Sequence, residues 1–109
     1  PPMRKAVNLL VRREDMTHEE FAEYWLEDHA PLVEDVLHVT AYSTSLPADP
    51  ERSVYDGIAE MYIESGVSVG DVFGSEAGQA LQADTPNFLD DDASVFVVVD
   101  EEVQFSRED

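Results

Sequence analysis

The chain of 109 residues contains no cysteine. Disulfide bridges, thiolate metal sites and a cysteine nucleophile are therefore excluded. Long apolar runs are also missing. The first run, from Ala6 to Val11, is interrupted by Asn8 and followed by Arg12 and Arg13, which is the wrong order for a signal peptide. We expect a cytoplasmic protein, and the length predicts a single domain over residues 1–109.

Basic residues are scarce: 6 stand against 25 acidic residues, the net charge is −19, and Lys5 is the only lysine. Contact with a phosphate backbone or an anionic membrane would rely on these few cations, so we expect neither nucleic acid nor a membrane as a partner. The self-repulsion opposes compaction in dilute buffer, whereas at molar salt the screening length falls to about 3 Å. The acidity favours a halophilic host with a salty cytoplasm. The alternative is an acidic protein from an ordinary host that tolerates the repulsion.

The segment from Thr17 to Val33, THEEFAEYWLEDHAPLV, predicts a helix that carries one histidine on an aromatic face. Thr17 and Glu20 have the spacing of a capping box, which fixes the start of the helix. Pro31 disfavours helix at the residue before it, so the helix is expected to stop or kink just past His29. On a helix, one stripe collects Phe21, Tyr24, Trp25, His29 and Leu32.

A histidine among aromatic residues has two interpretations. It is commonly a packed core residue whose ring is bonded to a carbonyl group. Wide aromatic walls also line ligand pockets, however, and the break predicted at Pro31 makes His29 a candidate site residue. The spacing leaves both interpretations open.

The remaining patterns predict four strands and a second helical region. Strands are expected at Met3 to Val11, His38 to Leu46, Tyr55 to Glu64 and Val95 to Val99, and short helices at Val69 to Phe73 and Glu76 to Ala83. This order is typical of an α+β, ferredoxin-like split βαβ sandwich (βαββαβ), in which the last strand usually lies at an edge. An edge strand reading VFVVV invites pairing, so we expect a second copy of the chain to cover it in a homodimer.

Three segments resemble, in order and spacing, the EthD family of dimeric α+β barrel proteins. They are FAEYWLEDHAPLV at 21–33, YDGIAEMYIES at 55–65, and the stretch from Ala83-Asp84 to Asn87-Phe88. The family takes its name from a protein of an ethyl tert-butyl ether degradation gene cluster. The resemblance implies that the open sheet packs on the dimer mate to close a barrel, with a pocket between sheet and helices. It also implies that the family's motif residues are His29, Asp56, Asp84 and Phe88 here. Such a fold alone fixes no reaction.

His29 can act as a general acid or base on a small ligand, because the pKa of a histidine lies near neutrality. The alternative is a histidine that only orients or supports its neighbours. Asp56 can pair with His29 or hold the turn next to Gly57. The aromatic residues that can contact a ring-shaped ligand are Phe21, Trp25, Tyr42, Tyr62 and Phe88, although aromatic residues in a small sandwich are usually core.

No metal site is expected, because HExxH and paired-histidine spacings are absent from the sequence. The leading hypothesis is a cofactor-free homodimeric enzyme, an isomerase, cyclase or monooxygenase, that binds a small hydrophobic or aromatic metabolite with Asp84 and His29 in its site. Two alternatives stay open. One is a non-catalytic ligand-binding or structural dimer, and the other is a haem-binding barrel with His29 as axial ligand.

Overall fold

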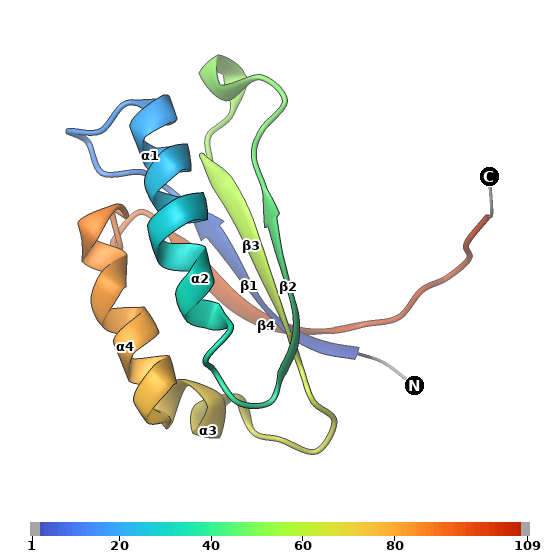
Figure 1. Cartoon of the computed structure of the whole chain (residues 1–109). Helices are drawn as coiled ribbons and strands as arrows, with labels where there is room; N and C mark the ends of the chain where they lie inside the picture. Colours follow the sequence, from blue (N-terminus) through green and yellow to red (C-terminus); the bar gives the residue numbers. More distant parts are fainter. Residues whose placement is uncertain (1–2, 108–109) are drawn as a thin grey trace.

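The computed structural model describes residues 3–107 and has two layers, a four-stranded antiparallel sheet and a set of helices on one side of it (Figure 1). The sheet order is β2-β3-β1-β4. The strands are β1 (Met3–Leu10), β2 (Val39–Ser45), β3 (Gly57–Ile63) and β4 (Val95–Glu101). The order of elements confirms the predicted ferredoxin-like fold, and β4 lies at an edge as expected.

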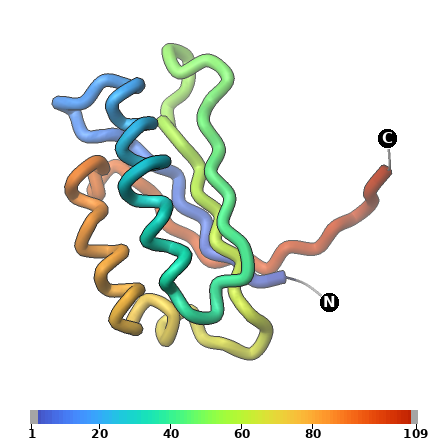
Figure 2. Tube along the Cα trace, viewed as in Figure 1, coloured from blue at the N-terminus to red at the C-terminus, as the bar shows by residue number. Residues whose placement is uncertain are grey.

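The first helical region comprises α1 (His18–Tyr24), a π-helical turn (Trp25–His29) and α2 (Ala30–Val33), and the second comprises α3 (Val69–Gly74) and α4 (Glu76–Asp84). Short 3₁₀ turns lie at Pro50–Arg52 and Thr85–Asn87. The predicted capping box is confirmed: the Glu20 amide donates to the Thr17 hydroxyl at 3.1 Å, and the Thr17 amide donates to the Glu20 carboxylate at 2.9 Å. In Figure 2 the first helical region runs as one continuous rod beside α4.

The helix was predicted to stop or kink just past His29, and the prediction of a stop there is wrong. The chain stays helical through Val33, and the irregularity precedes the proline as a π turn in which the Ala30 amide donates to the carbonyl of Trp25. A π turn bonds each amide to the carbonyl five residues earlier, so the hydrogen-bond ladder shifts by one residue before Pro31. The helix therefore passes the proline, whose missing N–H falls in the first turn of α2.

Two clusters of buried side chains fill the space between sheet and helices. One lies beneath α2, α3 and α4 and contains Ala6, Val33, Val36, Met61, Ile63, Val72 and Leu81. The other lies beneath α1 and the π turn and contains Leu10, Phe21, Trp25, Ala59, Phe88 and Leu89. Gly57 is required by the second cluster, because a β-carbon at this position would lie 2.5 Å from the ring of Trp25.

No element among residues 3–107 covers the other side of the sheet. Residues directly opposite each other in antiparallel strands share a face, so Val7 lies on this side with Val97, and Leu9 lies there with Ile58 and Val95. Val95 and Val97 are 40% and 43% exposed. We call this surface the open face. Within the same residues, no helix is long and apolar enough to cross a membrane.

Candidate functional site

His29 is the last residue of the π turn, and its side chain is buried on the sheet side of the helix. Its Nδ1 lies 2.8 Å from a carboxylate oxygen of Asp84, the last residue of α4. Its ring also packs on Phe88, with the ring centroids 4.6 Å apart. Contacts from two directions therefore fix the orientation of the imidazole.

Asp84 accepts hydrogen bonds from two further side chains. The Tyr24 hydroxyl donates to it at 2.6 Å, and the Asn87 amide donates to it at 3.0 Å. Burial raises the pKa of Asp84, but its hydrogen bonds to Tyr24, His29 and Asn87 together hold that pKa below the ordinary value of 3.8. Asp84 is therefore a carboxylate at neutral pH.

Burial lowers the pKa of His29 from its ordinary value of 6.5, and the interaction with Asp84 offsets only part of this effect. The ring is therefore neutral at pH 7 and carries one proton. Because the Asp84 carboxylate can only accept a hydrogen bond, the proton lies on Nδ1 and Nε2 keeps its lone pair.

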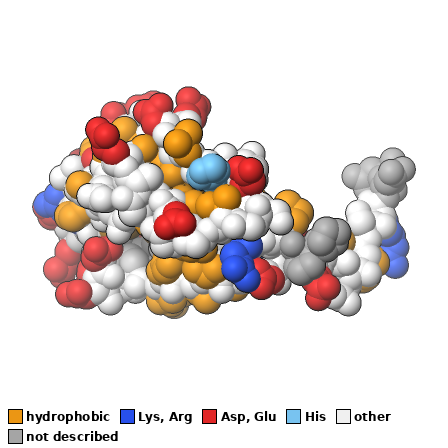
Figure 3. Space-filling model, turned by 90° about the horizontal axis from the view of Figure 1, so that it is seen from below, with side chains coloured by type: hydrophobic (Ala, Val, Ile, Leu, Met, Phe, Trp, Pro, Cys, Tyr) orange, Lys and Arg blue, Asp and Glu red, His pale blue; other side chains and the backbone are white. Residues whose placement is uncertain are grey.

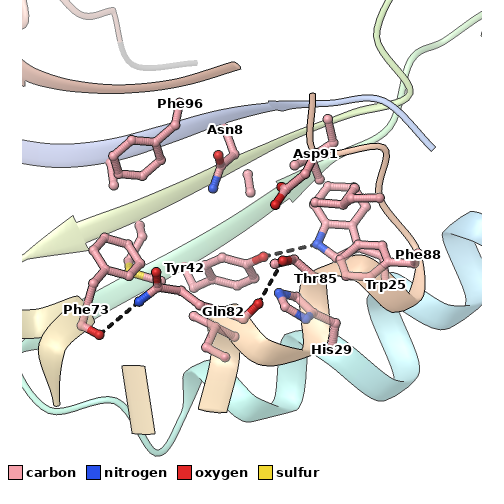
Figure 4. Close-up of a pocket in the computed structure, with 16 residues that line it drawn as sticks. Asn8, Trp25, His29, Tyr42, Phe73, Gln82, Thr85, Phe88, Asp91 and Phe96 are labelled. Carbon is pink, nitrogen blue, oxygen red and sulfur yellow. Dashed lines mark hydrogen bonds between the residues drawn. The ribbon is translucent and has the colours of Figure 1, made fainter. Parts of the chain in front are cut away.

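A pocket of about 490 Å³ lies between the sheet and the helices, and His29 borders it (Figure 4). Among residues 3–107, Nε2 of His29 has no hydrogen-bond partner, and no fully buried side-chain nitrogen or oxygen lacks one. Nε2 therefore opens onto the pocket. The pocket wall is largely apolar and includes the aromatic side chains of Trp25, Tyr42, Phe73, Phe88 and Phe96.

Tyr42 provides a second polar group at this pocket. The indole N–H of Trp25 donates to the Tyr42 hydroxyl at 3.1 Å, and burial raises the pKa of Tyr42. The hydroxyl is therefore neutral and accepts from Trp25, so its own proton remains available for an acceptor on a ligand. The pocket combines a basic nitrogen and a hydroxyl donor within aromatic walls.

The sequence profile described as the EthD domain matches residues 13–92, which include His29, Asp84 and Tyr24. The chain belongs to the EthD family. A curated relative, an uncharacterized 11.0 kDa protein from the thcB-thcC intergenic region of Rhodococcus erythropolis, is 35% identical over 72 residues, which are 62% of this chain and 68% of the relative.

Two solved structures resemble this EthD chain in fold. An EthD family protein from Bacillus halodurans superposes with a TM-score of 0.77 at 22% identity and covers 92% of this chain and 99% of its own. A protein of unknown function from Thermobifida fusca, described as a dimeric ferredoxin-like protein, superposes with a TM-score of 0.66 at 14% identity and covers 92% of each chain. At these identities the likeness shows the fold alone.

The structure brings most of the predicted site residues of this EthD domain together. Those at the pocket or directly behind its wall are Phe21, Trp25, His29, Tyr42, Asp84 and Phe88. Phe21 packs on the rings of Trp25 and Phe88 at 5.8 and 5.7 Å between centroids, so it supports the wall without lining it. The predicted aromatic stripe therefore combines core and pocket.

Two predicted ligand contacts, Asp56 and Tyr62, lie away from this pocket. Asp56 accepts the backbone N–H of Arg12 at 2.9 Å and lies 3.4 Å from His18, so it fastens the turn before β3 and does not meet His29. Tyr62 lies on the open face, where its hydroxyl donates to Glu101 at 2.9 Å. Side chains alternate along a strand, and β3 directs Met61 and Ile63 to the helices and Tyr62 away from them.

Sequence reasoning missed the remaining polar residues at the pocket, which are Asn8, Gln82, Thr85 and Asp91. Asn8 offered a signal, because it interrupts an apolar strand at a position that shares its face with Ala6 and Leu10. Asp91 lies in the turn before β4, and this turn borders the pocket.

Proposed function

We propose that this EthD protein is a cofactor-independent enzyme that transfers a proton within a small, hydrophobic or aromatic ligand held between sheet and helices. One observation carries the proposal: His29 is buried with Nδ1 tied to the Asp84 carboxylate, while Nε2 opens onto a pocket large enough for such a ligand. A neutral imidazole with a free lone pair is a general base, and a carboxylate behind it stabilises the imidazolium that forms.

The chemistry that this arrangement supports needs no oxidant. Nε2 takes a proton from a C–H or O–H group of the ligand, the electron pair stays on the ligand, and the same proton returns to another ligand atom. The net result is an isomerisation or a cyclisation. The Tyr42 hydroxyl can donate to the oxygen on which negative charge develops.

The test uses 2-tetralone, a neutral bicyclic ketone with acidic protons next to its carbonyl group. Exchange of these protons in D₂O is followed by proton NMR with and without the protein. We expect the protein to accelerate exchange and His29→Gln to remove roughly 10²-fold of that acceleration. His18→Gln is the control, because His18 does not line the pocket and should leave the rate unchanged. Equal rates for the two variants would refute the proposal.

A non-catalytic ligand-binding protein is the main alternative, and the same experiment separates the two. In that case 2-tetralone perturbs the amide resonances of pocket residues, yet its exchange rate stays at the value in buffer. We regard the tie between His29 and Asp84 as support for catalysis, since a ring that merely completes a core needs no free nitrogen at a pocket.

We propose that the site works without a cofactor, and we expect no haem there. Nε2 of His29 could ligate an iron, but no lysine or arginine lines the pocket to pair with haem propionates, and Asp91 would repel them. Haemin titration should therefore give no Soret band that depends on His29.

We propose that the working unit is a homodimer joined through the open face. On the strands of this face the acidic residues, Glu60 and Glu101, are both paired with Lys5 at 2.7 Å, and the other side chains are mostly apolar. In Figure 3, hydrophobic side chains gather along the lower border of the view, and acidic side chains form separate groups mainly along its upper and left parts. The Thermobifida fusca protein of similar fold is described as dimeric, which supports the same arrangement.

We also propose a cytoplasmic location in a high-salt host, with no nucleic acid or membrane partner. The 25 acidic residues against 6 basic ones support this setting.

A further inference from the structure

Asn8 lies at the centre of the pocket floor. It belongs to β1, an inner strand, and faces the helices between Ala6 and Leu10. Its cross-strand neighbours are Ala59 on β3 and Phe96 on β4. The two alanines are small, so the floor around the Asn8 side chain is left hollow.

The side-chain amide of Asn8 is free of hydrogen bonds within the described part of the protein. Among residues 3–107, its side-chain nitrogen and oxygen make no hydrogen bond, and no fully buried polar side-chain atom lacks a partner, so the amide reaches the open volume of the pocket. In Figure 4 the Asn8 amide points into the pocket from the sheet, and the His29 ring points into it from the helices. A flat ligand between them would meet a hydrogen-bonding group on each side.

The charges around the pocket limit what such a ligand can carry. None of its lining residues is lysine or arginine, and Asp91 is at its border. Asp84 adds a second carboxylate directly behind His29, whose ring is neutral at pH 7 because burial lowers its pKa. A ligand carboxylate or phosphate would therefore find negative charge and no cation.

We infer that Asn8 binds the carbonyl oxygen of an uncharged ring ligand, so that the pocket selects neutral ketones, with the carbonyl group in or attached to the ring, over carboxylates of the same shape. This inference rests on the proposed function and names its substrate class. When Nε2 of His29 removes a proton from the carbon next to the carbonyl group, the electrons of the broken C–H bond move to the carbonyl oxygen. The Asn8 N–H group then donates to an oxygen whose negative charge is growing, and the proton returns from His29 to carbon or oxygen.

Three probes with a common naphthalene skeleton test the inference: naphthalene, 2-acetylnaphthalene and 2-naphthoate. Their dissociation constants are measured at one salt concentration by NMR titration of the labelled protein. The neutral ketone should bind roughly three- to tenfold more tightly than naphthalene, the gain expected from one added hydrogen bond, and 2-naphthoate should bind more weakly than naphthalene.

The matched variant is Asn8→Leu, which keeps the size of the side chain and removes its amide. It should remove most of the advantage of 2-acetylnaphthalene over naphthalene and leave naphthalene binding unchanged. Glu23→Gln is the control, since Glu23 is exposed on α1, lies outside both the pocket and the open face, and should alter neither affinity. If Asn8→Leu does not fold, the ranking of the three probes by the wild-type chain still tests the preference for a neutral ketone.

Three results would overturn the inference: 2-naphthoate binding as tightly as the ketone, naphthalene matching the ketone, or Asn8→Leu keeping full ketone affinity. Its failure is distinct from failure of the proposed function. Ketone selectivity without His29-dependent exchange of 2-tetralone would leave Asn8 as a binding residue of a non-catalytic protein. His29-dependent exchange with no ketone preference would retain the general base and remove the role of Asn8.

Discussion

Asp84 lies behind His29 on the side away from the pocket, and it influences the ring in two ways. It holds the proton on Nδ1, and its charge raises the pKa that burial lowers. Burial has the larger effect, so the folded chain protonates His29 at a lower pH than the unfolded chain does. The unfolded state therefore binds more protons just below pH 6.5, and stability should fall as the pH is lowered through that range.

The Asp84→Asn variant tests this balance. Loss of the carboxylate removes the coulombic contribution of Asp84 and weakens its hydrogen bond, and both of these raise the pKa of His29, so that pKa should fall further below 6.5. NMR titration of the ring protons measures it. The variant should also slow 2-tetralone exchange roughly tenfold or more, because the imidazolium loses its counter-charge and the tautomer is no longer fixed. The Asn87→Ala variant serves as the control for a lost hydrogen bond to Asp84 without loss of charge. A pKa for His29 that rises in Asp84→Asn contradicts this account.

At the residue scale, the sequence supplied only part of the site. The spacing of Phe21, Trp25 and His29 was enough to place the three on one buried face, because helical periodicity is local. Asp84 came from the resemblance to EthD proteins. Its contact with His29 joins residues that are 55 positions apart in the sequence, and a local sequence pattern does not predict contacts over such a separation. Asn8 stands out in the sequence as a polar residue within an apolar run, but only the cross-strand register shows that it faces the pocket.

At the element scale, the strands and helices were predictable within a few residues because their signals are local: alternation, capping residues and breakers. The π turn at Trp25–His29 was not predictable. Pro31 indicates that a regular helix is disfavoured, but it does not indicate which backbone conformation replaces the regular helix. The edge position of β4 followed from the topology. The side chains of β4 are apolar on both sides, which the strand periodicity of a soluble monomer does not explain.

Val97 on β4 tests whether the open face is an interface. Val97 is 43% exposed and opposite Val7, so a glutamate there should leave the folded subunit intact and place a charge within the dimer contact. Sedimentation velocity should find the wild-type chain as a dimer and Val97→Glu as a monomer. Val54→Glu is the matched control, because Val54 is 81% exposed outside the sheet and should stay dimeric. A monomeric wild-type chain, or a dimeric Val97→Glu, would exclude this interface.

At the scale of the whole molecule, the charge is the dominant feature. Among residues 3–107, the basic residues that lie within 4.0 Å of a carboxylate include Arg4, Lys5, Arg12, Arg13 and Arg52. Their pairs neutralise a minority of the 25 acidic side chains, and the net charge remains −19. Salt weakens these pairs, but most of them are exposed and contribute little, whereas the repulsion among the unpaired carboxylates extends over the whole surface.

The melting temperature is therefore expected to rise as the potassium chloride concentration is raised from dilute to molar. A rise of at least about 4 °C would correspond to roughly 1 kcal/mol of relieved repulsion in a domain of this size.

Because salt can also strengthen apolar contacts, the control removes charge directly: a triple variant with Glu23, Glu27 and Glu34 changed to Gln should melt higher in dilute buffer and gain less from salt. These three carboxylates are exposed, so the change removes repulsion without loss of packing. The measurement is made on the Val97→Glu background as well, so that salt-driven dimerisation does not imitate screening. A melting temperature that is flat or falls with salt in both backgrounds would mean that the acidic surface is not an adaptation to high salt.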